Sequence, residues 1–476
     1  MRLKKLFSDS LLYGIPKYLG YLSAILLTPI YLRIFSKAEY GAQDVFQTWN
    51  NFVIMIIPLG LINSVERYYI EKNISKKKLI GTAMSILLIN CTIYILSIIC
   101  FKNFFLKGFL GEIKHVDVFY LSLALVVLTV VSDCFLSVLK IQIRSKQYAF
   151  ITITNFLILT VLGFTLVYFY HYGIEGFFYA GIISLMFNNV MSIYYLRNEL
   201  SITYDKDIVK LLFTFGIHYL LVSVVFQVFN VTDRYLISHY LSLDDVGIFS
   251  LGYRLSNFTQ FFITPFTLAW LPHAYRLKDH ESAESTFIKV SQIYVLICAI
   301  LLSTICLFRK ELIFYFSKEY SDAYVSIGIL AFLNFVMGLS YFWALGIPFK
   351  NKTIIYSYIA PISALLNFIA SWIGVRLIGI NGIALGSLIG GVFWIAALNY
   401  FSQKLYKINF NYTSYLPLLM FPVFFFFFSD KFDVLSTSML VTIAIKVLAI
   451  TITSTALLYF SGSWKTIIEY VKQRRN

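Results

Sequence analysis

The chain has 476 residues, of which 59% are hydrophobic, 18% aromatic and only 13% charged, and its mean hydropathy is +0.76. These values lie far outside the range of soluble globular domains and exclude a water-soluble core. The formal net charge of +15 is explained by basic segments flanking membrane spans and by attraction to anionic lipid, so nucleic-acid binding is not expected.

Fourteen apolar stretches follow one another along the chain, each near the length of about 20 residues that a helical span requires. They are too long for barrel strands of about 10 residues, and the bilayer core leaves helices as the alternative. We therefore predict an all-α polytopic membrane protein with about 14 transmembrane helices. The centres of these stretches lie near Tyr21, Ile54, Leu88, Val127, Ile158, Leu185, Val222, Phe261, Cys298, Phe335, Leu365, Ile389, Val423 and Ile450.

The first stretch is longer than the apolar core of a typical signal peptide, contains Pro16 and Lys17, and matches the seventh stretch. We therefore expect it to stay in the mature protein.

All five cysteines lie within apolar stretches and form no CxxC pair, so we expect neither disulfides nor a metal site. The connections are too short to fold a catalytic domain, and no P-loop motif is present. An enzyme is therefore not expected.

The two halves of the chain repeat each other at a shift of 206 residues. Ser36 to Gly41 falls on Ser242 to Gly247, and Asn51 falls on Asn257 in the same register. Internal duplication in a membrane protein is typical of transporters, with a site between the repeats. We predict a six-helix bundle over 1–200, a second over 201–405, and two further helices with a basic tail over 406–476.

Lysine and arginine are more than twice as frequent in the segments on the N-terminal side of the predicted membrane as in those on the other side. This bias predicts that both termini are cytoplasmic.

Polar residues inside the spans are the candidates for a central site. Gln43, Gln47, Asn50 and Asn51 follow helical spacing along the second span, and Asn257 lies on its repeat mate. Such residues are expected to line a water-filled cavity between the halves, because a charge facing lipid near the bilayer centre costs about 2.5 to 3.5 kcal/mol.

Each ionisable residue within a span or at its end has both a functional and a structural interpretation. Lys17 either is a cation in the cavity or snorkels to the interface, and Arg254 either faces the cavity or forms a structural ion pair. Asp133 pairs with a cation, carries a proton or joins helices. His218 titrates near neutral pH or is simply hydrogen-bonded.

Three more basic residues lie at helix ends within the repeat or in the two helices that follow it. Arg67 and Arg234 mark helix ends, where charges act as interfacial anchors or as gate and substrate contacts. Lys446 belongs to the last two helices, outside the repeat, and is expected to face a groove, a lipid headgroup or a neighbour.

Several sequence blocks carry a resemblance to a known family. LLYGIPKYLGYLSAILLTPIYLRIFSKAEYGAQDVF from Leu11 and PLGLINSVERYY from Pro58 are similar to the start of the polysaccharide-unit (O-antigen) flippases of the Wzx type, in the MOP exporter superfamily. VTDRYLISHYLSLDDVGIFSLGYRL, LAWLPHAY and HYGIEGFFYAG agree with it, over about the first 400 residues. The resemblance implies two six-helix bundles in a V-shaped arrangement, with a pair of helices appended.

The resemblance also implies a function and a partner. Such flippases export undecaprenyl-diphosphate-linked oligosaccharides from the inner to the outer leaflet of the cell membrane, alongside the polysaccharide polymerase and other assembly proteins. Lys17, Arg254, Arg67 and Arg234 would hold the diphosphate, because it requires cations. Gln47, Trp49, Asn50, Asn51 and Asn257 would meet sugars. No cofactor is expected, and the coupling ion, H⁺ or Na⁺, is open, with Asp133 and His218 as candidates.

Three alternatives stay open. A multidrug and toxin extrusion pump should carry acids in its cavity, and among the spans only Asp133 stands out as an acid. A lipid II flippase shares the helix number and a cationic cavity. A membrane polymerase or ligase would need catalytic groups at the outer face.

Overall fold

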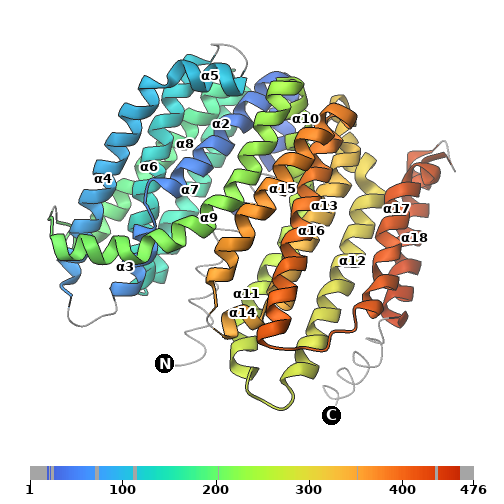
Figure 1. The fold of residues 1–476 in the computed structure, drawn as a ribbon. Coiled ribbons are helices and arrows are strands. Elements are labelled where there is room, and N and C mark those ends of the chain that lie inside the picture. Colours follow the sequence, from blue (N-terminus) through green and yellow to red (C-terminus); the bar gives the residue numbers. More distant parts are fainter. Residues whose placement is uncertain are drawn as a thin grey trace. The chain divides into compact units, whose positions relative to one another are not determined.

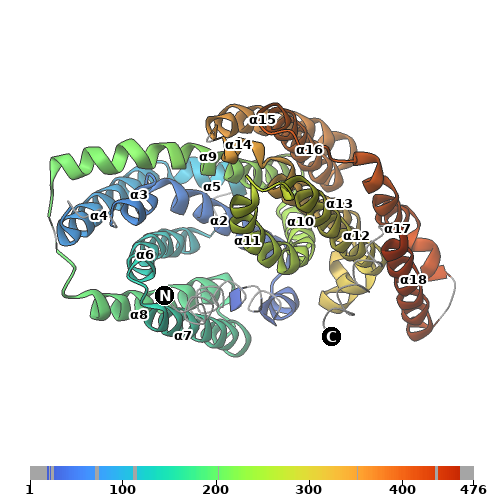
Figure 2. The same cartoon turned by 90° about the horizontal axis from the view of Figure 1, so that it is seen from below.

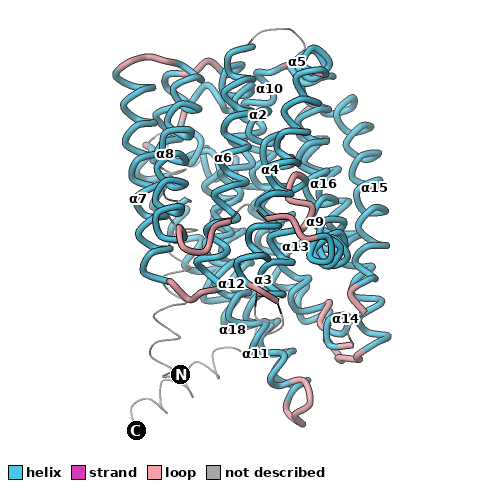
Figure 3. Tube along the Cα trace, turned by 90° about the vertical axis from the view of Figure 1, so that its left-hand side faces the viewer, coloured by secondary structure: helices cyan, strands magenta, loops and turns pink. Residues whose placement is uncertain are grey.

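The computed structural model describes residues 19–20, 22, 26–69, 74–110, 115–201, 203–350, 352–434 and 438–460. This part of the chain consists of helices and loops, without a strand (Figure 3), which confirms the predicted all-α class. The longer helices of Figure 1 are α2 Lys37–Ile56, α3 Leu61–Tyr68, α4 Lys76–Cys100, α5 Lys102–Leu110, α6 Val116–Ile141, α7 Ser145–Phe164, α8 Gly173–Leu196, α9 Lys206–Tyr240, α10 Leu243–Ser256, α11 Gln260–Leu277, α12 Ala283–Phe316, α13 Tyr324–Trp343, α15 Ile354–Ile378, α16 Ile380–Leu405, α17 Leu416–Val434 and α18 Met439–Phe460. Short helical segments are η1 Thr165–Phe169, η2 Asn257–Thr259, η3 Lys318–Ala323, α14 Gly346–Phe349 and η4 Tyr412–Tyr415.

Within the described residues, ten helices are long and apolar enough to cross a membrane, and the bent pair of α2 and α3 makes an eleventh candidate. Eleven of the fourteen predicted spans coincide with these. The stretch near Tyr21 lies mostly outside the described residues, while Val222 and Phe261 fall within α9 and α11. The protein is therefore a multi-pass membrane protein, and the total of fourteen spans stays a prediction.

The chain divides into two compact units, Met1–Gly247 and Ile248–Asn476. This boundary lies beyond residue 200, where the first bundle was predicted to end. The reason is α9, which packs against α2, α3, α4 and α5 of the first unit. Its residues Ile208 and Leu212 share a buried core with Leu61 and Val65 of α3. The described part of the last two helices belongs to the second unit.

In the first unit, α2 is a central helix that contacts α9, α6 and α8, and α8 packs between α6 and α7 (Figure 2). The α2–α3 span bends by 43° at Pro58, Leu59 and Gly60, because Gly60 has a φ of +73° and closes against the backbone of Gly216 in α9. The carbonyl of Ile57, which the bend deprives of its helical partner, accepts a hydrogen bond from Nδ2 of Asn90 at 2.9 Å.

The predicted repeat is visible as two matching helix starts in the first unit. Ser36 caps α2 in a capping box with Glu39. At the start of α10, the backbone N–H of Asp245 donates to Oγ of Ser242, whose hydroxyl donates to the Asp245 carboxylate, and Ser36 and Glu39 make the same two contacts. The two starts also meet. A Cβ on Gly41 would overlap the carbonyl oxygen of Leu243, and one on Gly247 would overlap that of Lys37. Glycine is required at both positions because the backbones touch.

The second unit is a row of helices in which each packs on the next: α15 on α16, α16 on α13, α13 on α12, and α12 on α17 and α18 (Figure 2). The α10–α11 span is interrupted by η2, and α11 contacts α12 and α13. The C-terminal helices α17 and α18 therefore attach to the row through α12.

Candidate functional site

The polar residues of α2 do not share one environment. The side chains of Gln43 and Asn50 are 0% and 2% exposed, Gln47 is half-buried and Asn51 is exposed. Both amide atoms of Gln43 and of Asn50 lack a hydrogen-bond partner among the described residues. A buried amide without a partner costs about 1 to 3 kcal/mol, so these two positions are suited to bind water or a polar ligand group.

A buried ion pair joins α2 to α9. The Nε of Arg234 donates to Oδ2 of Asp44 at 2.9 Å, and the two side chains are 3% and 9% exposed. Arg234 was expected at a helix end, but α9 continues to Tyr240, which places the guanidinium inside the first unit. Asp44 was missed by sequence reasoning, although an acid within an apolar span is itself a signal. Asp133 is thus not the sole acid within a span.

Arg67 lies at the C-terminal end of α3, exposed, with its guanidinium 5.4 Å from the centre of the Tyr68 ring. Its neighbour Glu66 pairs instead with Lys140 of α6 at 2.7 Å. The exposed guanidinium of Arg67 thus lies beside an aromatic ring at this end of the first unit.

Asp133 lies in the C-terminal third of α6 and is exposed. It has an electrostatic interaction with Tyr148 of α7, but within the described residues its carboxylate has neither an ion pair nor a hydrogen bond. A carboxylate in a span without a counter-charge is a candidate for binding a proton or another cation.

In the second unit, the polar residues gather where η2 interrupts the α10–α11 span. Nδ2 of Asn334 in α13 donates to Oδ1 of Asn257 and to the carbonyl of Ser256, both at 3.2 Å. Gln260 donates to Oδ1 of Asn334 at 3.3 Å. Arg254 lies one helical turn before Asn257 and is half-buried. The sequence predicted Arg254 and Asn257 but missed Asn334, which has no match in the repeat.

Two predicted residues cannot be placed. Lys17 lies outside the described residues, and His218 belongs to α9 but its side chain is outside them too. Their roles stay predictions.

Lys446 has a clear environment, which differs from the groove, headgroup or neighbour that was expected. Its side chain is 0% exposed and its Nζ lies 2.6 Å from Glu311 of α12 and 2.5 Å from Asp433 of α17. Asp433 also pairs with Lys310 at 3.1 Å, and Lys310 pairs with Asp430 at 3.0 Å. This alternating chain of charges fastens α18 and α17 to α12.

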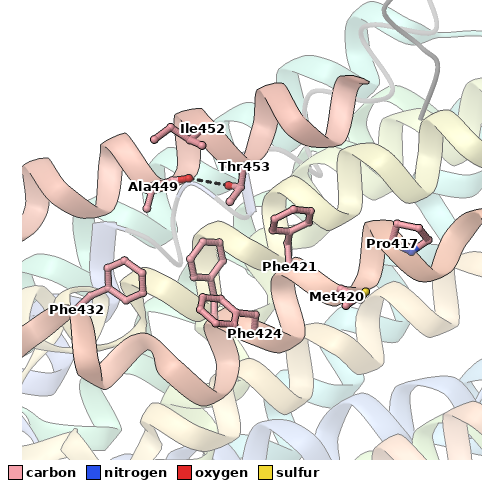
Figure 4. Close-up of a pocket in the computed structure, with 9 residues that line it drawn as sticks. Pro417, Met420, Phe421, Phe424, Phe432, Ala449, Ile452 and Thr453 are labelled. Atoms are coloured by element: carbon pink, nitrogen blue, oxygen red, sulfur yellow. Dashed lines mark hydrogen bonds between the residues drawn. The ribbon is translucent and has the colours of Figure 1, made fainter. Parts of the chain in front are cut away.

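Beside this chain of charges, α17 and α18 enclose an apolar groove of about 630 Å³ (Figure 4). The hydroxyl of Thr453 donates to the carbonyl of Ala449 at 2.9 Å within α18, so it is satisfied and leaves the groove without a free polar group. Such a surface fits a hydrocarbon chain. The lining residues are Pro417, Met420, Phe421, Phe424, Phe425, Phe432, Ala449, Ile452 and Thr453.

Solved structures with the same fold are membrane transporters. An inward-facing multidrug resistance MATE family transporter of the MOP superfamily has a TM-score of 0.68 at 13% identity, covering 83% of this chain and 97% of that one. The lipid II flippase MurJ in an inward closed conformation gives 0.71 at 14%, with 95% and 99% covered. A variant of the MATE transporter VcmN from Vibrio cholerae gives 0.58 at 16%, with 84% and 96% covered.

At these identities the likeness shows the fold alone. No curated protein matches the sequence significantly. The family model for polysaccharide biosynthesis proteins matches residues 6–278, more than half of the chain. The chain therefore belongs to the polysaccharide biosynthesis protein family and has the fold of the MOP superfamily transporters.

Proposed function

We propose that this protein is a flippase that moves undecaprenyl-diphosphate-linked oligosaccharides from the cytoplasmic to the outer leaflet, by alternating access, for O-antigen, capsule or exopolysaccharide synthesis. The family match over residues 6–278 carries the proposal, because it links a multi-pass membrane fold to polysaccharide biosynthesis. The neighbour described as a lipid II flippase is a precedent for moving a lipid-linked sugar with this fold. The protein resides in the cytoplasmic (inner) membrane with both termini in the cytoplasm, and acts as a transporter without a cofactor.

The described side chains support separate roles for the parts of such a substrate. Arg67 is exposed and Arg254 half-buried, so both are suited to a diphosphate, together with Lys17. Arg234 already pairs with Asp44, and a substrate would have to replace that carboxylate. The groove between α17 and α18 is suited to part of the prenyl chain.

Two further roles concern the glycan and the energy source. Half-buried Gln47 and exposed Asn51 are suited to sugar hydroxyls, and Asn50 would add a contact if the substrate or water reaches its unpartnered amide. Asp133 is our candidate for proton coupling, with His218 as a second, and Na⁺ is the alternative ion. The polysaccharide polymerase and other assembly proteins are the proposed partners.

Flipping in proteoliposomes tests the proposal directly. An undecaprenyl-diphosphate-linked oligosaccharide that carries a fluorescent label on its sugar is added to vesicles containing the full-length protein, with and without a proton gradient. A reductant that cannot cross the bilayer bleaches only the outer label. We expect protein-dependent transfer, reduced by Arg254→Ala but not by Arg376→Ala, because Arg376 stacks on Trp372 at 4.0 Å at the end of α15.

The same vesicles separate the rival function. If none of the lipid-linked oligosaccharides moves but a cationic dye is exported, the protein is a drug exporter and the proposal is wrong. Sugar analysis of the cell envelope of a deletion strain provides the matching test in cells, where we expect a loss of surface polysaccharide.

A further inference from the structure

The interruption of the α10–α11 span creates a polar cluster whose hydrogen-bond directions can be worked out. The carbonyl of Ser256 lies at the break and can only accept. Its partner in α13 must therefore be Nδ2 of Asn334, the donor end of that amide, at 3.2 Å. This contact determines which way the Asn334 side chain is turned.

The orientation of the Asn334 amide determines that of the Asn257 amide. The Nδ2 of Asn334 also donates to Asn257 at 3.2 Å, and since this contact needs an acceptor, Asn257 must present its Oδ1. Gln260 donates to the opposite end of Asn334 at 3.3 Å, which agrees with the orientation that the Ser256 carbonyl requires. The Nδ2 of Asn257, with two N–H donors, is consequently turned away from Asn334.

These two donors are available. Asn257 is half-buried, and its Nδ2 donates to none of the described residues. Arg254 precedes it by three positions, so the guanidinium and the amide lie on the same face of the helix. Donors on a helix face next to a cation match a negatively charged acceptor, and the phosphoryl oxygens of a diphosphate are acceptors of that kind.

Building on the proposed function, we propose that Asn334 is a positioning residue that turns the amide donors of Asn257 toward the phosphoryl oxygens of the lipid diphosphate, beside Arg254. This assigns Asn257 to the diphosphate, whereas the family resemblance implies that it meets the sugars. Asn334 itself acts through Asn257 and does not touch the substrate.

Binding of undecaprenyl diphosphate, which carries no sugar, to the purified full-length protein in detergent tests this assignment. The decisive variant is Asn257→Asp, because the carboxylate still accepts from Asn334 and preserves the cluster, but replaces the outward donors with an anion. We expect Asn257→Leu to weaken binding about 10-fold or more, and Asn257→Asp to weaken it further, with an unchanged thermal unfolding midpoint for Asn257→Asp.

A double-mutant cycle separates positioning from a structural role. We expect Asn334→Leu to weaken binding in the wild-type background but to have no further effect in the Asn257→Leu background, because its influence passes through Asn257. Asn399→Leu is the matched control, since Asn399 also lies in the second unit and bonds Tyr412 at 2.8 Å. It should leave binding unchanged.

Each of the other outcomes refutes either the proposed function or this inference alone. If the wild-type protein does not bind undecaprenyl diphosphate, the proposed function fails and this inference with it. If the wild type binds and Asn257→Asp binds equally well, or Asn334→Leu weakens binding independently of Asn257, only the inference is wrong. If the variants reduce binding of phosphatidylglycerol to the same degree, the donors serve phospholipid headgroups in general, and the assignment to the diphosphate is refuted.

Discussion

The buried ion pair between Arg234 and Asp44 allows a quantitative test of which charges hold the first unit together. The two groups lie 2.9 Å apart and are 3% and 9% exposed, so neither charge is hydrated. Removing one partner takes the counter-charge of this pair away from the other buried group, which costs about 3 to 5 kcal/mol. Replacing both partners by apolar residues of similar volume costs much less.

We expect Asp44→Leu and Arg234→Met each to lower the thermal unfolding midpoint by about 10 °C, since about 1 kcal/mol corresponds to about 2 to 4 °C for a unit of this size. The double variant should lose clearly less than the sum of the two. Tryptophan fluorescence of the purified full-length protein in detergent, recorded during heating, measures all three.

Lys78→Met is the matched control, because Lys78 lies 3.9 Å from Asp205 with the side chains 63% and 32% exposed. An exposed pair contributes at most about 1 kcal/mol, so a small shift is expected. The reasoning is refuted if either single variant shifts the midpoint no more than this control does, or if the losses of the two single variants simply add.

Three further predictions follow from other parts of the structure. Lys446→Met should lower the unfolding midpoint by several degrees, because two paired carboxylates lose their buried cation, whereas Lys431→Met at the exposed face should not; equal effects would contradict the buried network. Gly41→Ala should reduce the yield of folded protein on gel filtration, because its Cβ meets backbone, while Gly108→Ala has open space; a fully folded Gly41→Ala protein would disprove the close approach. Asp133→Asn should abolish the acceleration of flipping by a proton gradient while lipid binding persists, and an unchanged gradient dependence in the vesicle assay would remove Asp133 from coupling.

The fold class follows from the sequence because long apolar stretches in a bilayer have few alternatives to helices. The repeat is equally readable, since the capping residues Ser36 and Ser242 and the glycines that follow them are local signals. The extent of α9 is not, because whether its first turns pack on the first unit depends on contacts with α3 and α4 that no local pattern encodes.

The candidate site is less accessible to sequence reasoning for the same physical reason. Asp44 and Arg234 are 190 positions apart, and Lys446 meets Glu311 across 135. Spacing along one helix shows which polar residues share a face, but it does not reveal their partners on a distant helix. Asn334 was missed because a single asparagine in an apolar span carries no distinguishing pattern.

Pairing separates the charged and polar side chains discussed above into two groups with different consequences. Arg234 and Lys446 are buried against carboxylates at 2.5 to 2.9 Å, and displacing either cation would take a buried positive charge away from its carboxylate partners. A transport cycle that uses them as substrate contacts has to compensate for that loss in every turnover. The Nδ2 of Asn257 carries no such penalty, because it donates to none of the described residues. The carboxylate of Asp133 likewise accepts no hydrogen bond and forms no ion pair within the described residues. If transport uses the groups that are least costly to engage, then substitutions at Asn257 and Asp133 should impair transport while sparing folding, and substitutions at Arg234 and Lys446 should impair folding first.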